Sequence, residues 1–179
     1  ALRAFWLELA ITQKDISVPL SSLFSHNTKA VDSTAPRLAF VRDAVRMPLT
    51  GAPDEATLVR YPDQPDKDPR RHDLTTGHVW IEEEDTSMAS FRLKDLVDVD
   101  RHEDTLIAGA IERQDQRPIV HWTVDASNDA TLILAEDDEL HEISGRLEPH
   151  DFPAGTVVQL ERIGYAILLE NGRLLMAHE

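Results

Sequence analysis

The chain has 179 residues, enough for one good hydrophobic core or two small ones. It contains no cysteine, which excludes a disulfide framework, a thiolate metal site and a cysteine nucleophile. No apolar run approaches the roughly 20 residues needed to cross a bilayer, and no signal peptide pattern is present. We therefore expect a soluble, cytoplasmic protein with no membrane partner. Because the chain begins at Ala1 directly in a helical pattern, we expect a segment of a longer chain.

The charge balance is acidic, with 33 Asp and Glu against 18 Lys and Arg and a formal net charge of −15. Only four of the basic residues are lysines. One interpretation is an acidic protein that binds no polyanion, because phosphate neutralisation supplies most nucleic-acid affinity. The other is a protein of a halophile, whose carboxylate-rich surface stays soluble in multimolar salt. Such salt shortens the Debye length below about 3 Å and screens repulsion from RNA. Charge alone favours the first interpretation.

Two helical patterns open the chain and predict a helical hairpin with a packed core. The apolar stripe of the first helix consists of Leu2, Phe5, Trp6 and Leu9, at helical spacing. The second helix follows Pro19, and its inward-facing positions are expected to be Leu20, Leu23, Phe24 and Val31. Pro36 ends the helical part, because a proline disfavours helix in the residue before it.

The remainder of the chain contains about ten β-type runs, which predicts a barrel or sandwich region in two halves. Residues 50–77 are the most loop-like part. The strongest hairpin signal is Asn171-Gly172, because both residues tolerate positive φ. In the run before this turn, alternation predicts one strand face made of Val157, Gln159, Glu161 and Ile163.

Patterning alone identifies no catalytic or metal site. The eight histidines include no His-x-x-x-His or Glu-x-x-His pair on a helix. A Gly-rich phosphate loop and a Ser-His-Asp or Cys-His arrangement are also absent from the sequence. The acidic runs at 82–85 and 136–139 are expected to be solvated turns. We therefore predict a segment without a catalytic residue or a bound metal.

Three motifs give the chain a specific resemblance to a known family. They are Lys14-Asp-Ile-Ser-Val18, Pro118-Ile-Val-His-Trp122 and Gln159-Leu-Glu-Arg-Ile-Gly-Tyr165. They resemble the C-terminal anticodon-binding region of archaeal-type glutamyl-tRNA synthetases, to which glutaminyl-tRNA synthetases are related. The resemblance extends over nearly the whole chain and suggests a halophilic archaeon as the source. It implies a mainly β fold of two consecutive, interleaved antiparallel β-barrels over residues 37–179. A helical connector over residues 1–36, at the end of the catalytic half, would precede them.

The resemblance also assigns residues to RNA binding. Arg37 matches an arginine that contacts the central anticodon uracil, and Gln159 matches an amide that reads the same base. An amide offers a donor and an acceptor, and a guanidinium can stack on a base and donate paired bonds. Arg92 and Lys94 match cations that contact anticodon-loop bases and phosphates. Arg70 matches an arginine of a nearby loop, although a shift of one residue would give that role to Arg71.

The implied partners are tRNA-Glu, with tRNA-Gln left open, and the catalytic half of the same enzyme. The parent enzyme would use ATP and Mg²⁺, but its ATP-binding signatures are absent here, so this segment is expected to take no cofactor. Two alternatives stay open. One is the same region of a glutaminyl-tRNA synthetase. The other is an acidic β-barrel that binds a protein and no RNA, in which Arg37 would form a surface ion pair with Asp32 or Asp43. His121 and Trp122 are expected to be structural.

Overall fold

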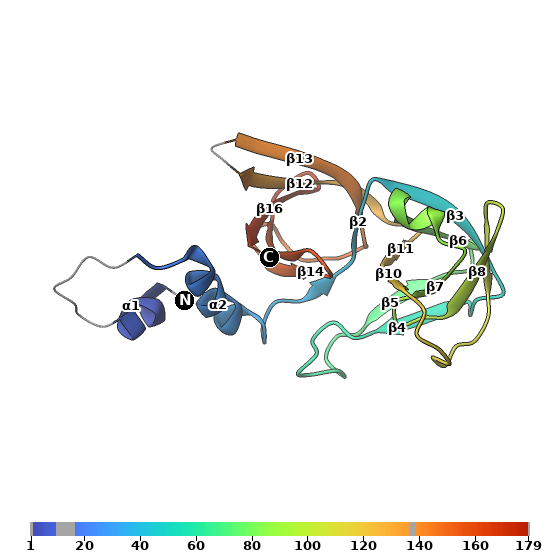
Figure 1. The fold of residues 1–179 in the computed structure, drawn as a ribbon, viewed down its shortest axis with the longest axis horizontal. Coiled ribbons are helices and arrows are strands. Elements are labelled where there is room, and N and C mark those ends of the chain that lie inside the picture. Colours follow the sequence, from blue (N-terminus) through green and yellow to red (C-terminus); the bar gives the residue numbers. More distant parts are fainter. Residues whose placement is uncertain (1, 10–16, 137–138, 179) are drawn as a thin grey trace.

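The computed structural model describes residues 2–9, 17–136 and 139–178. Two helices, α1 (Leu2–Leu9) and α2 (Leu20–Val31), lie at one end of the molecule, and two barrel-like sheets of seven strands each follow (Figure 1). The predicted mainly β class with a helical module in front is confirmed. Within the described ranges, no helix has the length and apolar character that a membrane span requires. Most of the motif at 14–18 lies outside the described residues.

The first barrel is built from both ends of the β region. Its strands are β1 (Arg37–Leu38), β2 (Phe40–Arg42), β12 (Asn128–Glu136), β13 (Glu139–Leu147), β14 (Val157–Leu160), β15 (Gly164–Leu168) and β16 (Arg173–His178). Their order in the sheet is β1-β14-β15-β16-β12-β13-β2. Since only Ala39 separates β1 from β2, the two edges of the sheet are drawn together. The core contains Leu38, Phe40, Leu132, Leu160 and Leu174.

The second barrel is inserted between β2 and β12 of the first. Its strands are β3 (Ala44–Thr50), β6 (His78–Glu82), β7 (Ser90–Leu93), β8 (Asp98–His102), β9 (Thr105–Ala108), β10 (Ile119–Val120) and β11 (Trp122–Val124). Their order is β10-β7-β8-β9-β3-β6-β11, so the two edge strands are again consecutive, here with His121 alone between them. A 3₁₀ helix, Glu83–Ser87, follows β6. The hairpin of β4 (Glu55–Leu58) and β5 (Arg70–Asp73) forms a separate small sheet.

Most strand pairs are antiparallel, but each barrel also contains parallel pairs. In the first barrel these are β1 with β14 and β12 with β16. In the second they are β3 with β9 and β7 with β10. The parallel pair of β1 and β14 brings the start of the β region beside a strand near the end of the chain.

The predicted hairpin at Asn171-Gly172 is confirmed, with φ values of 58° and 70°. A side chain on Gly172 would meet the carbonyl oxygen of Asp129 at 2.8 Å. Glycine therefore also permits the turn to approach the backbone at the start of β12 closely. The single run predicted before this turn is wrong. The chain reverses between β14 and β15, where Arg162 adopts a φ of 69°, so Glu161 and Ile163 do not continue the strand face of Gln159.

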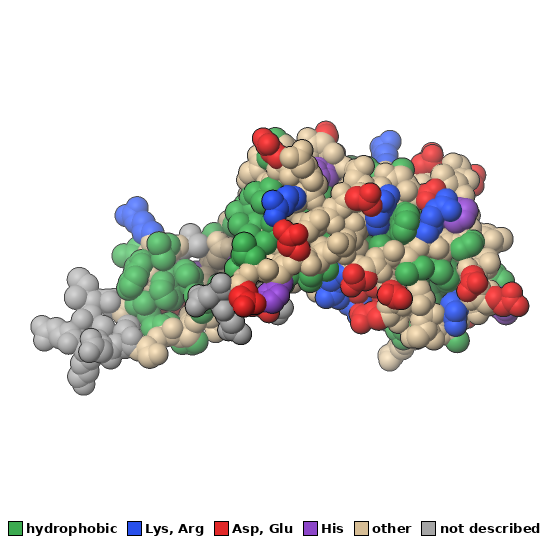
Figure 2. Space-filling view, turned by 90° about the horizontal axis from the view of Figure 1, so that it is seen from above, with side chains coloured by type: hydrophobic (Ala, Val, Ile, Leu, Met, Phe, Trp, Pro, Cys, Tyr) green, Lys and Arg blue, Asp and Glu red, His purple; other side chains and the backbone are tan. Residues whose placement is uncertain are grey.

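Three predictions about burial are also wrong, two in the helices and one in the acidic run at 82–85. Leu20 is 61% exposed instead of facing inward, and Trp6 of the first apolar stripe is 62% exposed. Hydrophobic side chains accordingly gather on the helical end of the molecule, whereas acidic and basic side chains are interspersed over the barrels (Figure 2). In the acidic run at 82–85, Glu82 and Asp85 are buried, because Glu82 accepts two hydrogen bonds from Arg42, both at 3.0 Å, and Asp85 faces Arg162.

Candidate nucleic-acid interface

Arg37 and Gln159 lie side by side, although 122 residues separate them in the sequence. The parallel register of β1 and β14 places them opposite each other, and backbone bonds fix both strands there. The Nε of Arg37 donates to Oε1 of Gln159 at 2.8 Å. Both residues are half-buried, and neither side chain makes a further hydrogen bond to the described residues. We call Arg37 and Gln159 the reading pair.

One member of the reading pair, Gln159, lies at a hollow of the first barrel. This hollow, of about 430 Å³, is lined by Gln159 together with aliphatic side chains and two arginines, Arg42 and Arg162. Arg162 was not predicted as a site residue. Its side chain is 45% exposed and lies 3.7 Å from the Asp85 carboxylate. The glycine at 164 was the signal for the turn that presents it.

Arg70 is not accessible to an RNA in this structure. Its side chain is 1% exposed and lies between the two barrels, where it donates to Glu148 at 2.9 Å and to Glu161 at 3.1 Å. Strand alternation in β5 buries Arg70 and exposes Arg71 instead. The expectation that Arg70 holds a loop phosphate therefore needs correction, because a buried guanidinium with two carboxylate partners is not accessible.

Lys94, whose side chain is partly exposed, contacts the same group. Its Nζ contacts the Glu161 carboxylate at 2.9 Å and that of Asp95 at 2.5 Å. We call Arg70, Lys94, Glu148 and Glu161 the ionic hub. Burial alone would raise the pKa of Glu161, but the charges of Arg70 and Lys94 outweigh it, so the pKa lies below its usual value. Glu161 thus stays ionised and joins one barrel to the other.

Glu148 anchors the hub from the first barrel and was missed by sequence reasoning. It is fully buried and accepts the backbone N–H of Ala39, between β1 and β2, at 2.9 Å. Burial raises the pKa of Glu148, although Arg70 opposes this. His72 lies 3.8 Å from the same carboxylate. Burial, followed by the charges of Arg70 and Arg60, lowers the pKa of His72 to about 4.

Arg92 lies apart from both groups, on β7. It donates to the Asp98 carboxylate at 2.7 Å and to the backbone carbonyl of Ile111 at 2.6 Å. Trp122 is buried and donates its Nε1–H to the carbonyl of Lys94 at 3.0 Å, in line with the expected structural role. Among the residues with described positions, no group of three or more His, Asp or Glu could hold a metal ion.

Comparisons with known proteins identify the family of the chain. Residues 35–115, which include Arg37, Arg70, Arg92 and Lys94, match the family described as tRNA synthetases class I (E and Q), anti-codon binding domain. The glutamate–tRNA ligase of Natronomonas pharaonis is 33% identical over 170 residues, which cover 89% of this chain and 29% of that protein. The ligase of Pyrococcus abyssi is 32% identical, covering 92% of this chain and 31% of the relative.

A third relative, the glutamate–tRNA ligase of Halobacterium salinarum, is 30% identical over 89% of this chain and 30% of its own length. The chain thus spans about three tenths of the length of these curated relatives. The matched family region contains β5 and β7, which carry Arg70 and Arg92, whereas Gln159 lies beyond that region. The chain belongs to the family of anticodon-binding domains of the class I tRNA synthetases for glutamate and glutamine.

Proposed function

We propose that this chain is the anticodon-binding part of a glutamate–tRNA ligase and that it binds the anticodon loop of tRNA-Glu. Its membership of the anticodon-binding family supports RNA binding, and the names of its relatives support glutamate as the amino acid. The observation that carries the proposal is the reading pair. Two side chains suited to base recognition are fixed against each other at the surface, with donor groups left for a ligand.

The reading pair can distinguish uracil from cytosine by its donors and acceptors. The amide of Gln159 can accept from the uracil N3–H and donate to O4, while the free Nη groups of Arg37 donate to a second carbonyl oxygen. Cytosine has an amino group in place of O4 and an acceptor at N3, so the same arrangement leaves polar groups unpaired. One base contact of this kind is worth about 1–3 kcal/mol of discrimination.

The other cations divide by accessibility. Arg162 is the exposed cation that lines the hollow beside Gln159, so it is suited to hold a flanking phosphate. Lys94 and Arg92 are predicted RNA contacts that would first have to leave Glu161 and Asp98. Phosphate contacts would set affinity and register, and the reading pair would supply sequence preference.

We also propose that glutamate activation, with ATP and Mg²⁺, takes place in the part of the ligase outside this chain, and that the whole enzyme acts in the cytoplasm. The length of the relatives supports a large further region. The chain itself carries no phosphate-binding loop motif, which supports the proposal that it takes no cofactor.

The test is binding of the chain to tRNA-Glu transcripts at high KCl, with the central anticodon uracil intact or replaced by cytosine. High salt is chosen because the net charge of −15 repels RNA at low salt. We expect binding that weakens by about 10- to 100-fold on replacement. Tighter binding of tRNA-Gln than of tRNA-Glu would assign the chain to the glutamine branch. No binding at any salt would favour an acidic module that binds a protein.

A further inference from the structure

A row of side chains crosses four strands of the first barrel and starts at the reading pair. Strand register places Arg37 opposite Gln159, Gln159 opposite Tyr165, and Tyr165 opposite His178. Residues directly opposite each other on neighbouring strands lie on the same face of a sheet, about 5 Å apart. We call these four residues the cross-strand row. It runs from the proposed base contact to the strand that faces α2.

Tyr165 is the buried centre of this row. It is 4% exposed, and its hydroxyl donates to Oδ1 of Asp32 at 2.6 Å. Asp32 is the C-cap residue of α2. Burial raises the pKa of Tyr165, and its bond to Asp32 and the charge of Asp32 raise it further. The hydroxyl is therefore protonated at neutral pH and acts as a fixed donor to α2.

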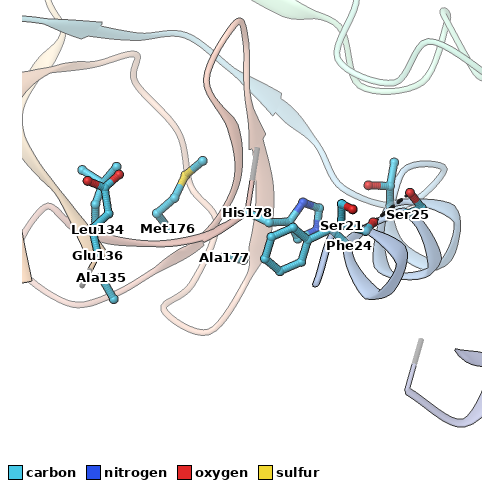
Figure 3. Close-up of a pocket in the computed structure, with 10 residues that line it drawn as sticks. Ser21, Phe24, Ser25, Leu134, Ala135, Glu136, Met176, Ala177 and His178 are labelled. Atoms are coloured by element: carbon cyan, nitrogen blue, oxygen red, sulfur yellow. Dashed lines mark hydrogen bonds between the residues drawn. The ribbon is translucent and has the colours of Figure 1, made fainter. Parts of the chain in front are cut away.

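The far end of the row is held by the same helix. The His178 ring stacks on Phe24 of α2, with ring centres 5.1 Å apart and planes at 14°, and lies 5.1 Å from the ring of Tyr165. Figure 3 shows Phe24 and His178 face to face between β16 and α2. Asn27 of α2 also bonds the His178 ring at 2.7 Å. Beside this contact, a hollow of about 530 Å³ separates α2 from β12 and β16.

The attachment of α2 to the first barrel is thus concentrated on the row. No residue of α2 is fully buried, and the hollow leaves Ser21, Ser25 and Thr28 without close packing against β12. The Asp32–Tyr165 bond involves the residue directly opposite Gln159 on the neighbouring strand. On one side Gln159 accepts a hydrogen bond from Arg37, and on the other its strand partner is Tyr165, whose hydroxyl is bonded to Asp32.

We propose that Tyr165 and Asp32 are positioning residues for anticodon reading: their hydrogen bond fixes the Tyr165 ring, and the ring orients the Gln159 amide for the base. This inference rests on the proposed function. Neither residue touches the RNA. Because an amide discriminates uracil from cytosine only when its oxygen and nitrogen are correctly oriented, loss of the bond lowers discrimination more than affinity.

The test measures the ratio of the dissociation constants for tRNA-Glu with a central cytosine and with a central uracil. Tyr165→Phe keeps the ring and removes the hydroxyl, and Asp32→Ala removes the acceptor. Both are expected to reduce the ratio by about tenfold, the effect of one hydrogen bond. Asp32→Asn retains an acceptor oxygen and is expected to preserve the ratio. Ser25→Ala, whose hydroxyl bonds only Ser21 within α2, is the matched control.

A purely structural role would give a different result. Partial unfolding lowers the concentration of active protein and weakens binding of both RNAs equally, so it leaves the ratio unchanged. An unchanged ratio in Tyr165→Phe and Asp32→Ala, with discrimination intact in the unmodified chain, overturns this inference alone. If the unmodified chain does not discriminate, the proposed function fails and the inference with it. If Tyr165→Phe does not fold, the comparison of Asp32→Ala with Asp32→Asn decides.

Discussion

The reading pair and the ionic hub both contain arginines that the family resemblance assigns to RNA, but they differ in their surroundings. Arg37 is half-buried and bonds a neutral amide, and it forms no ion pair with a carboxylate of the described residues. Arg70 is 1% exposed and lies between two carboxylates. The difference shows that a motif position fixes the type of side chain, while solvent access and the charge of the partner decide whether it binds a ligand or stabilises the fold.

The largest effect is expected from Arg70→Ala. Removing one member of a buried ionic group leaves Glu148 and Glu161 without their main partner, which costs about 3–5 kcal/mol of folding free energy. Urea unfolding measures this change. Arg71→Ala is the matched control, because Arg71 lies on the exposed face of the same strand, and its effect is expected to stay within about 0.5 kcal/mol. An equal loss of folding free energy in Arg70→Ala and Arg71→Ala would contradict the structural role of Arg70.

The next largest effect is a pH dependence of the folding free energy, which arises from His72 beside the ionic hub. The pKa of His72 in the folded chain is about 4, below the ordinary value of 6.5, so the unfolded chain takes up the proton first. Stability should therefore fall as the pH drops from about 6.5 to 4, by about 3 kcal/mol in total. Urea unfolding at pH 7 and pH 5 tests this. His72→Gln should show a shallower dependence, and an unchanged slope in that variant would contradict the assignment.

Arg37→Ala is expected to weaken RNA binding with little loss of stability, in contrast to Arg70→Ala. The affinity for tRNA-Glu should fall by about 10- to 100-fold, because a base contact worth about 1–3 kcal/mol is lost. The stability should change by less than about 1 kcal/mol, since the side chain is half-buried and bonds only one amide. Filter binding and urea unfolding on the same preparation provide both numbers. A large loss of stability with unchanged affinity would place Arg37 with the structural arginines.

The smallest effect concerns the salt dependence of RNA binding. Each phosphate contact contributes about 0.7 to the slope of log affinity against log salt for a single strand. We expect Arg162→Ala to reduce the slope by about that amount, because its side chain is exposed beside Gln159. Lys94→Ala should leave the slope unchanged, since the ammonium group of Lys94 already forms an ion pair with Glu161. A reduced slope in Lys94→Ala would show that Lys94 leaves Glu161 to contact RNA.

Local sequence signals predicted a substantial part of the fold. The Asn171-Gly172 turn is confirmed because its signal depends only on backbone φ, which the two residues themselves determine. The helices α1 and α2 follow from apolar spacing in the same way. The turn at Arg162 was missed because an arginine rarely adopts positive φ, and the nearby Gly164 is only a weak local signal for a turn. The inserted order of the barrels came from the family resemblance, since strand pairing over 122 residues leaves no periodic pattern.

The candidate site was predictable only in part for a related reason. The resemblance selected Arg37 and Gln159, and the register of β1 and β14 brings them together. It also selected Arg70, but the carboxylates that bury this arginine lie 78 and 91 residues away. Nothing near Arg70 in the sequence indicates that Glu148 is its partner. Exposure is a property of the assembled barrels, so it could not be read from residue type.

The insertion of one barrel into the other also has a consequence during protein synthesis. A ribosome releases residues 44–124 as a continuous stretch, so the second barrel has all its strands before the first barrel has more than two. β1 must wait for β14, which emerges more than a hundred residues later. Until then Leu38 and Phe40 have no strand to cover them. The first barrel is therefore the last part of the nascent chain to close, and it closes beside an inserted barrel whose strands are already complete.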